Sequence, residues 1–226
     1  MASDEVLLES AVRGIASLRF YQWSPATLSL GYFQAEQSRR QVPSLIDLPF
    51  VRRASGGATL IHHHEVTYAL ALPAGQPWQI GEPWLRRMHV IIADALRELG
   101  VDSRLHGPDN GLRFHGSLCF QHFTASDLMI GSSKIVGSAQ RKQRGALMQH
   151  GGILLASSSF TPGLPGILEL TGRSLTVQQT CDTVRRSLVK VTGWQVVEND
   201  WNKAELNRIA DLANNKYSQD PWNRKR

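Results

Sequence analysis

The stretch LMIGSSKIVGSAQ, residues 128–140, carries the clearest indication of the fold. The apolar run 128–130 (LMI) and the segment 134–136 (KIV), which is apolar after its lysine, flank the turn residues 131–133 (GSS). Apolar runs joined by a short glycine-containing turn are typical of a β-hairpin. A further apolar run at 146–155 follows shortly afterwards. Because hairpins connect neighbouring antiparallel strands, this region predicts an antiparallel sheet.

The rest of the chain follows the same pattern of short strands joined by turns. Further strands are expected at 18–23, 27–30, 50–53, 59–61, 66–72, 102–106 and 194–197. Helices are expected at 4–16, 82–99, 177–191 and 202–216. Strands outnumber helices and follow one another instead of alternating with them, which predicts an α+β fold with a mainly antiparallel sheet flanked by helices.

Length and composition limit the class of protein. The 226 residues fit a single domain over 1–226 that can bury its own core. No apolar run is long enough to cross a bilayer, and the first five residues, MASDE, are acidic. Two cysteines are too few for a disulfide scaffold. These features predict a cytoplasmic protein without a membrane span or a secretory signal.

Charge suggests an acidic partner. Lys and Arg number 25 against 19 Asp and Glu, a net charge of +6, and many basic residues are clustered, for instance at 141–144 and 224–226. Aromatic residues do not alternate with these clusters and no nucleic-acid-binding motif is present, so DNA or RNA binding is not expected. A basic face that docks an acidic carrier protein stays open.

Two polar segments contain the residue types of a ligand site. In RRASGG, residues 52–57, arginines precede a glycine turn that lets a phosphate or carboxylate approach the backbone, although such turns are common and by themselves favour a plain turn. In HHHE, residues 62–65, three consecutive histidines suggest a metal cluster, but neighbours along a strand point to opposite faces. We therefore expect one structural histidine, two exposed ones and no metal.

Cys119 and Lys134 are candidates for chemistry. Cys119 follows a glycine-rich stretch, 107–116, and lies among histidines and near a lysine, a setting that can stabilise a thiolate. Because most free cysteines are buried, a packing role stays open for it, and Cys181 within the predicted helix 177–191 fits that role. Lys134 either protects a strand edge or directs a fixed positive charge at a carbonyl or carboxylate.

Eight short motifs occur in order along the chain. They are LRFYQWSP (18–25) with SLGYFQ (29–34), RRxSGG (52–57), HxxExTY (62–68), KIVGSAQ (134–140) with RG (144–145), QHG (149–151) and KYSxxxWN (216–223). This ordered set resembles the biotin/lipoate protein ligase family, specifically its lipoate-ligase-like branch, over residues 4–223. The resemblance implies a catalytic domain related to biotin ligases and class II aminoacyl-tRNA synthetases.

One segment bears on the reaction within that branch. ATP-dependent ligases usually carry Gly-Arg-Asn-Asp ahead of the lysine strand, whereas this chain has CFQHFTASD, residues 119–127, with Ser126 where Asn is expected. The Cys-Phe pair resembles the LipM-type octanoyltransferases, whose loop cysteine carries the acyl group, and residues 137–140 and 149–151 match them too. Ala58 is a difference, because the family often has Arg or Gly there.

The resemblance implies transfer of an octanoyl group from acyl carrier protein, through a thioester on Cys119, to a lysine of a lipoyl domain. Acceptors would be 2-oxoacid dehydrogenase E2 subunits or the glycine cleavage H protein, and Lys134 would orient the carbonyl and stabilise negative charge. The implied substrate-binding residues are Arg52, Ser55, Gly56, Gly57, His62, Gly137, Ser138, Ala139 and His150, the last also a candidate for proton transfer. No cofactor is expected, because a thioester is already activated.

Three alternatives stay open. An ATP-dependent lipoate ligase would use Lys134 to contact carboxylate and phosphate; the missing Asn-Asp pair and the lack of an obvious C-terminal accessory domain disfavour it. An amidotransferase would move octanoyl between lipoyl-bearing proteins. A non-catalytic module would only bind carrier or lipoyl domains, which the presence of both Cys119 and Lys134 disfavours.

Overall fold

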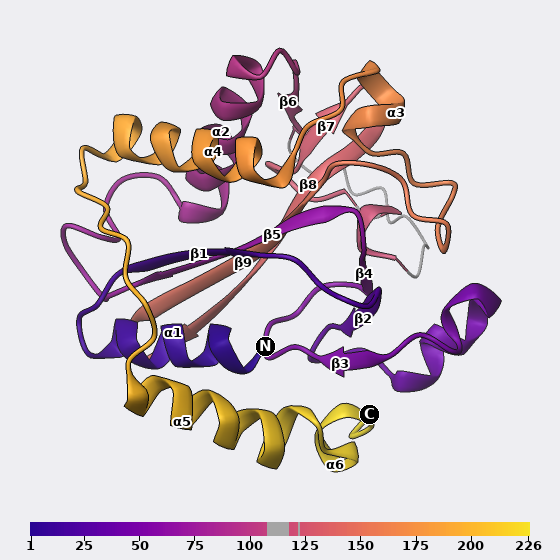
Figure 1. Cartoon of the computed structure of the whole chain (residues 1–226), viewed down its shortest axis with the longest axis horizontal. Helices are drawn as coiled ribbons and strands as arrows, with labels where there is room; N and C mark the ends of the chain where they lie inside the picture. Colours follow the sequence, from indigo (N-terminus) through magenta and orange to yellow (C-terminus); the bar gives the residue numbers. More distant parts are fainter. Residues whose placement is uncertain (108–117, 122) are drawn as a thin grey trace.

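The computed structural model describes residues 1–107, 118–121 and 123–226, which form a twisted sheet between helices (Figure 1). The main sheet contains, in spatial order, β1 (Ser17–Tyr21), β5 (Glu65–Leu72), β9 (Ala146–Leu154), β8 (Ser133–Gln143), β7 (Leu128–Ile130) and β6 (Arg104–Leu105). Every neighbouring pair is antiparallel, as the sequence predicts. Most of the glycine-rich stretch at 107–116, and the histidine at 122, lie outside the described residues.

Strands β8 and β9 form the longest hairpin and carry much of the predicted site. The expected hairpin over 128–136 is confirmed as β7 and β8, with Gly131 at a φ of 57° in its turn. Strand β8 then continues well past its expected end and turns through Arg144 and Gly145, at φ 48° and 82°. Two consecutive residues with positive φ are typical of two-residue hairpin turns, whose twist matches the twist of the strands.

A second, three-stranded sheet lies beside the main one (Figure 1). Its strands are β2 (Thr27–Leu30), β3 (Phe50–Arg52) and β4 (Leu60–His62), in the order β3-β2-β4. Strands β2 and β3 are parallel, an exception to the antiparallel pattern. Parallel neighbours need a crossover connection, and the segment between them supplies it through two short 3-10 turns, Glu36–Gln41 and Pro43–Leu45.

Helices cover both faces of the main sheet (Figure 1). Helices α2 (Trp84–Glu98) and α4 (Val177–Thr192) pack on one face, against apolar residues that include Tyr68 and Leu70. Helix α1 (Ala2–Val12) packs on the other face, against small and flexible residues of β5 and β9. Every residue of β5 is therefore buried although its side chains alternate between the two faces. None of the helices in the described ranges has the length and hydrophobicity to cross a bilayer.

The expected helices are confirmed with shifted ends, and the described part of the chain also contains short helical segments that were not predicted. The C-terminal elements are α3 (Ile167–Thr171), α5 (Lys203–Leu212), a π-helical turn (Ala213–Tyr217) and α6 (Asp220–Asn223). Helix α1 begins and ends earlier than predicted, and the prediction for 202–216 corresponds to α5 and the π turn.

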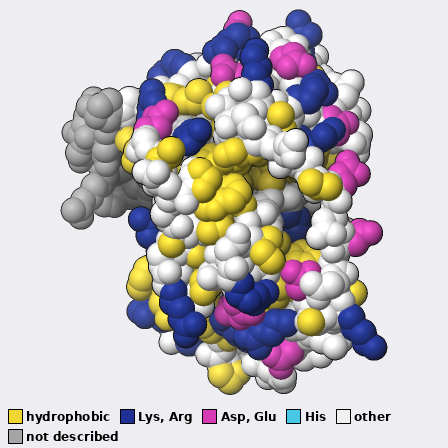
Figure 2. All heavy atoms as spheres, turned by 90° about the vertical axis from the view of Figure 1, so that its left-hand side faces the viewer, with side chains coloured by type: hydrophobic (Ala, Val, Ile, Leu, Met, Phe, Trp, Pro, Cys, Tyr) yellow, Lys and Arg dark blue, Asp and Glu magenta, His cyan; other side chains and the backbone are white. Residues whose placement is uncertain are grey.

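The strand predicted at 194–197 is wrong. This segment has no regular structure, and the Trp194 ring packs against Trp78 and Trp84 at centroid distances of 4.9 and 5.4 Å. Trp194 therefore docks this connector on the protein, whereas Val196 and Val197 are exposed, and the segment does not pair within a sheet. Figure 2 presents the left-hand side of Figure 1, where hydrophobic side chains gather in the middle and Lys and Arg lie above and below them.

Candidate active site

Cys119 and Lys134 meet at one end of the main sheet. Cys119 opens a 3-10 turn (Cys119–Gln121), and its backbone N–H donates to the Thr59 carbonyl at 2.6 Å. Lys134 lies near the start of β8, with Nζ 3.9 Å from the Cys119 Sγ and 3.3 Å from its carbonyl oxygen. The structure thus brings together the two predicted catalytic side chains, with Cys119 half-buried and Lys134 buried.

A carboxylate that the sequence analysis did not select holds the Lys134 ammonium. The Oδ2 of Asp127 lies 2.8 Å from Nζ, and both side chains are at most 5% exposed. The same oxygen accepts hydrogen bonds from the backbone N–H and hydroxyl of Thr124, at 2.7 and 3.0 Å. Because these bonds fix the carboxylate, they also fix the charge beside Cys119.

Two glycines that pair across β8 and β9, Gly137 and Gly152, form a surface without side chains that we call the glycine floor. A Cβ on Gly137 would lie 2.4 Å from Cε and 2.7 Å from Nζ of Lys134. A Cβ on Gly152 would lie 2.4 Å from Oε2 of Glu65. Glycine at both positions thus allows the ends of the Lys134 and Glu65 side chains to occupy their observed places, which a Cβ would force them to leave.

Arg53 brings a second cation close to the thiol. Its guanidinium donates to the carbonyls of Ser29, Gly56 and Ala58 at 2.7–3.1 Å, which holds the 52–57 turn against the sheet. Burial lowers the pKa of Arg53, and the interaction with Cys119 opposes that shift. Arg53 and Lys134 therefore both present positive charge to the Cys119 side chain.

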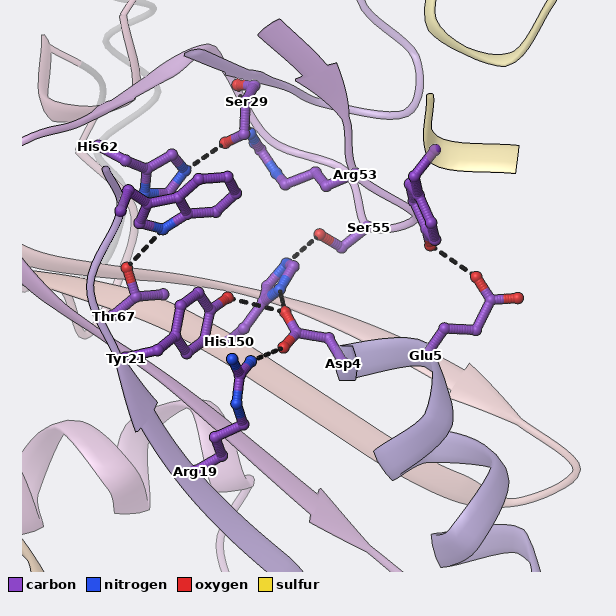
Figure 3. Close-up of polar contacts among 12 residues, drawn as sticks. Asp4, Glu5, Arg19, Tyr21, Ser29, Arg53, Ser55, His62, Thr67 and His150 are labelled. Carbon is purple, nitrogen blue, oxygen red and sulfur yellow. Dashed lines mark hydrogen bonds and ion pairs between the residues drawn. The ribbon is translucent and has the colours of Figure 1, made fainter. Parts of the chain in front are cut away.

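His62 is the centre of one buried hydrogen-bonded chain, and Figure 3 shows its contact with Ser29. Its Nδ1 lies 2.5 Å from Oε1 of Glu65 and its Nε2 lies 2.7 Å from the Ser29 hydroxyl. Thr67 donates to the same Glu65 oxygen at 2.6 Å, and the Trp23 ring stacks on the imidazole at 4.2 Å. The neutral form of His62 would thus be held as one tautomer, with Nδ1 protonated toward the carboxylate.

His150 is the centre of a second chain on the same face of the sheet (Figure 3). Its Nε2 lies 2.5 Å from the Ser55 hydroxyl and its Nδ1 lies 3.0 Å from Oδ2 of Asp4. Burial lowers the pKa of His150 although Asp4 opposes the shift. Burial alone would raise the pKa of Asp4, but the Met1 amino group, His150 and Arg19 together hold it far below its usual range.

Three further predicted site residues, Ala139, Ser138 and Arg52, lie in three different surroundings. Ala139 lies on the glycine-floor face, 4.0 Å from where a Cβ on Gly57 would stand, and so faces the 52–57 turn. Ser138 points to the opposite face, where its hydroxyl lies 2.5 Å from both Tyr68 OH and His89 Nε2. Arg52 is fully buried, and its guanidinium donates to backbone carbonyls, including that of Asn223 at 3.0 Å.

Sequence reasoning missed several residues of this site: Asp4, Ser29, Glu65 and Asp127. Glu65 and Asp127 stood inside quoted motifs, but nothing in the sequence assigned them a partner. In the described part of the chain no group of three or more His, Cys, Asp or Glu side chains is arranged to hold a metal ion. The rings of His63 and His64 stack on each other at 3.7 Å.

An apolar cleft opens beside Cys119. Its lining residues are Thr59, Leu60, Ile61, His63, His64, Leu118, Cys119, Phe120, Leu154, Ser158, Thr161 and Leu164. The cleft therefore places a thiol beside a mainly hydrocarbon surface.

The site combines a thiol, an ammonium fixed beside it and the glycine floor of an antiparallel sheet. Such a site defines a catalytic α+β domain suited to acyl-group chemistry. The chain belongs to the lipoyl protein ligase A/B catalytic domain family, whose model matches residues 1–190. The Octanoyltransferase LipM of Anoxybacillus flavithermus is 30% identical to it over 260 residues, covering 100% of this chain and 93% of that protein. The family expected from the ordered motifs is thereby confirmed.

Solved structures establish the fold independently. A crystal structure of lipoate-protein ligase A bound with ATP superposes with a TM-score of 0.80 at 21% identity, covering 99% of this chain and 92% of that one. The bi-partite lipoate protein ligase of Thermoplasma acidophilum gives a TM-score of 0.73 at 17% identity, covering 98% and 91%. The predicted relation to lipoate ligase catalytic domains is confirmed.

Proposed function

We propose that this chain is an octanoyltransferase of protein lipoylation, an acyltransferase that works through a thioester on Cys119. The observation that carries the proposal is the contact between the Cys119 Sγ and the Lys134 ammonium, 3.9 Å apart, in a family member whose relative is an octanoyltransferase. A thioester donor is already activated, so this chemistry needs no nucleotide. We infer that the donor is octanoyl-acyl carrier protein and the acceptor a lipoyl domain.

The reaction has two steps. The Cys119 thiolate attacks the carbonyl carbon of the donor thioester, the bond to the carrier sulfur breaks, and the carrier thiolate leaves and takes up a proton. The amine of a lipoyl-domain lysine then attacks the acyl-enzyme, the bond to the Cys119 sulfur breaks, and an amide remains. In both steps Lys134 faces the oxygen that gains negative charge, a contribution of about 3 kcal/mol for a well-placed donor.

The octanoyl chain needs an apolar site near the thiol. The cleft beside Cys119 offers Ile61, Leu118 and Leu164 for that purpose. The 52–57 turn and His62 remain part of the proposed lining, because Arg53 and Ser29 tie them to the same face. The net charge of +6 suits an acidic carrier protein and an acidic lipoyl domain.

Intact-mass spectrometry tests the proposal. The protein is mixed with octanoyl-acyl carrier protein without ATP, and the Cys119→Ser variant is run beside Cys181→Ser, which removes the other cysteine. We expect an octanoyl adduct on the parent and on Cys181→Ser, none on Cys119→Ser, and discharge of the adduct when a lipoyl domain is added.

Other outcomes assign other activities. Absence of an adduct, with transfer only when ATP and free octanoate or lipoate are supplied, would make the protein a ligase. Faster loading from an octanoylated lipoyl-bearing protein than from acyl carrier protein would make it an amidotransferase. Binding of carrier or lipoyl domains without any transfer would make it a binding module.

A further inference from the structure

We propose that Glu65 receives the lysine of the acceptor protein, binding its ammonium group and taking its proton as the amine attacks the acyl-enzyme. This inference rests on the proposed acyl transfer and assigns a residue to its second step. It begins from a buried polar atom that has no hydrogen-bond partner among the residues that the structure describes.

One oxygen of the Glu65 carboxylate is satisfied and the other is not. Oε1 accepts from the Thr67 hydroxyl and lies 2.5 Å from His62 Nδ1. Oε2 is buried, and no atom of the described chain hydrogen-bonds to it, although the residue is only 1% exposed. A buried carboxylate oxygen without a donor is costly and uncommon. A donor that arrives with a ligand would remove that cost.

The unpartnered oxygen points over the glycine floor. It would touch a Cβ on Gly152, and Lys134 Nζ would touch a Cβ on Gly137. These two glycines pair across the strands, so their missing side chains are on the same face and roughly 5 Å apart. Oε2 and Nζ therefore lie within roughly 10 Å of each other on that face. Cys119 contacts Nζ, so a thioester and an attacking amine fit between the two groups.

The chemistry of the second step needs such a group. A lysine side chain has a pKa near 10.4 and arrives protonated at neutral pH, so it must lose a proton before it can attack. Lys134 and Arg53 are cations and repel it. Glu65 is an anion whose free oxygen can bind the ammonium and accept one proton. When the tetrahedral intermediate collapses, the departing Cys119 thiolate takes the second amine proton, and Glu65 releases its own to solvent.

The surroundings of Glu65 favour this assignment over His150. Both ring nitrogens of His150 are already engaged, with Ser55 and Asp4, and His150 pairs with Ala139, two residues along β8 from Gly137. His62 and Thr67 hold Glu65 through Oε1 alone. These contacts fix the orientation of the carboxylate and leave Oε2 without a hydrogen-bond donor among the described residues.

The two half-reactions of the Glu65→Gln variant test the proposal. We expect the variant to form the octanoyl adduct from octanoyl-acyl carrier protein at the parent rate. We expect discharge of that adduct by a lipoyl domain to slow about 100-fold or more, the usual contribution of a positioned general base. Hydroxylamine is unprotonated at neutral pH, so it should discharge the parent and the variant at equal rates.

Matched variants separate this role from a structural one. Thr67→Val removes the hydrogen bond to Oε1 but keeps the carboxylate, so we expect it to discharge to the lipoyl domain far faster than Glu65→Gln. Should Glu65→Gln not fold, Glu65→Asp gives the same comparison, with slow discharge to the lipoyl domain and normal discharge to hydroxylamine. Equal slowing with both nucleophiles, or no slowing, would overturn the assignment. Absence of any adduct on the parent would instead contradict the proposed function.

Discussion

Gly137 is a residue whose missing side chain determines where a charge lies. The Lys134 side chain crosses the space that any Cβ at 137 would fill, and Asp127 holds its far end. Because the ammonium is buried, small displacements change both its ion pair and its distance from the Cys119 sulfur. Function at this site therefore depends on the shape of a backbone surface as well as on the groups above it.

The Gly137→Ala variant is expected to separate activity from stability. Its methyl group must push the end of the Lys134 side chain aside, a flexible group that can move without disturbing the backbone. We expect adduct formation to slow at least 10-fold, while the midpoint of thermal unfolding changes by only a few degrees. Gly163→Ala, at a site with no atom within 4 Å of the new Cβ, serves as the control. Parent-like rates for both variants would show that Lys134 does not need its observed position.

The β7–β8 hairpin shows how one element serves both the fold and the site. Asp127 directly precedes β7 and Lys134 lies near the start of β8. Their ion pair therefore connects the beginning of the first strand of the hairpin to the second strand. Strand β8 then contributes Gly137 to the glycine floor and pairs with β9 at eight positions. The same hairpin that makes the sheet antiparallel thus places the ammonium beside the cysteine turn.

Asp127→Asn should be strongly destabilising because it leaves a buried ammonium without its negative partner. Breaking a buried ion pair from one side costs about 3–5 kcal/mol, whereas an exposed pair contributes at most about 1 kcal/mol. Asp94→Asn, which breaks the exposed pair with Arg97, is the matched control. The free energy of unfolding in urea is the measurement. A loss for Asp127→Asn no larger than that for Asp94→Asn would show that the buried pair is not needed.

On the scale of the whole molecule, two histidines, His89 and His150, are buried on opposite faces of the main sheet. His89 of α2 lies 2.6 Å from the Ser126 carbonyl on the side of the long helices, and His150 lies on the side of α1. Burial lowers the pKa of each below the ordinary value of 6.5. The unfolded chain therefore takes up protons at a higher pH than the folded protein does.

This difference predicts a loss of stability on acidification. Because the unfolded state binds more protons once the pH falls below about 6.5, the free energy of unfolding should fall there, by at most about 1.4 kcal/mol per pH unit for each histidine. Urea unfolding at pH 8, 7, 6 and 5 measures the slope. His89→Gln should flatten it, whereas His64→Gln, at an exposed position, should not. An unchanged slope in His89→Gln would contradict the assignment to that residue.

The order of elements could largely be predicted from the sequence because it depends on local patterns. Alternating apolar residues, glycine turns and amphipathic periods indicate which segments form strands and which form helices. The motifs between 52 and 151 also identified Cys119 and Lys134. The segment at 194–197 failed because apolar residues of a connector and of a strand look alike when their packing partner, here Trp78 and Trp84, is unknown. That residues 1–226 form one domain stays a prediction.

The sequence by itself determined the α+β class, the family and the two residues proposed to react, since each follows from nearby residues or from motifs in order. Tertiary structure alone decided which groups surround them. Asp127, Glu65 and Asp4 are ordinary acidic residues in the sequence. The β7–β8 hairpin turns Asp127 toward Lys134, the pairing of β5 with β9 turns Glu65 toward the glycine floor, and the packing of α1 on the sheet turns Asp4 toward His150. The physical reason is that burial and the direction of a side chain depend on distant strands, which local patterns do not specify.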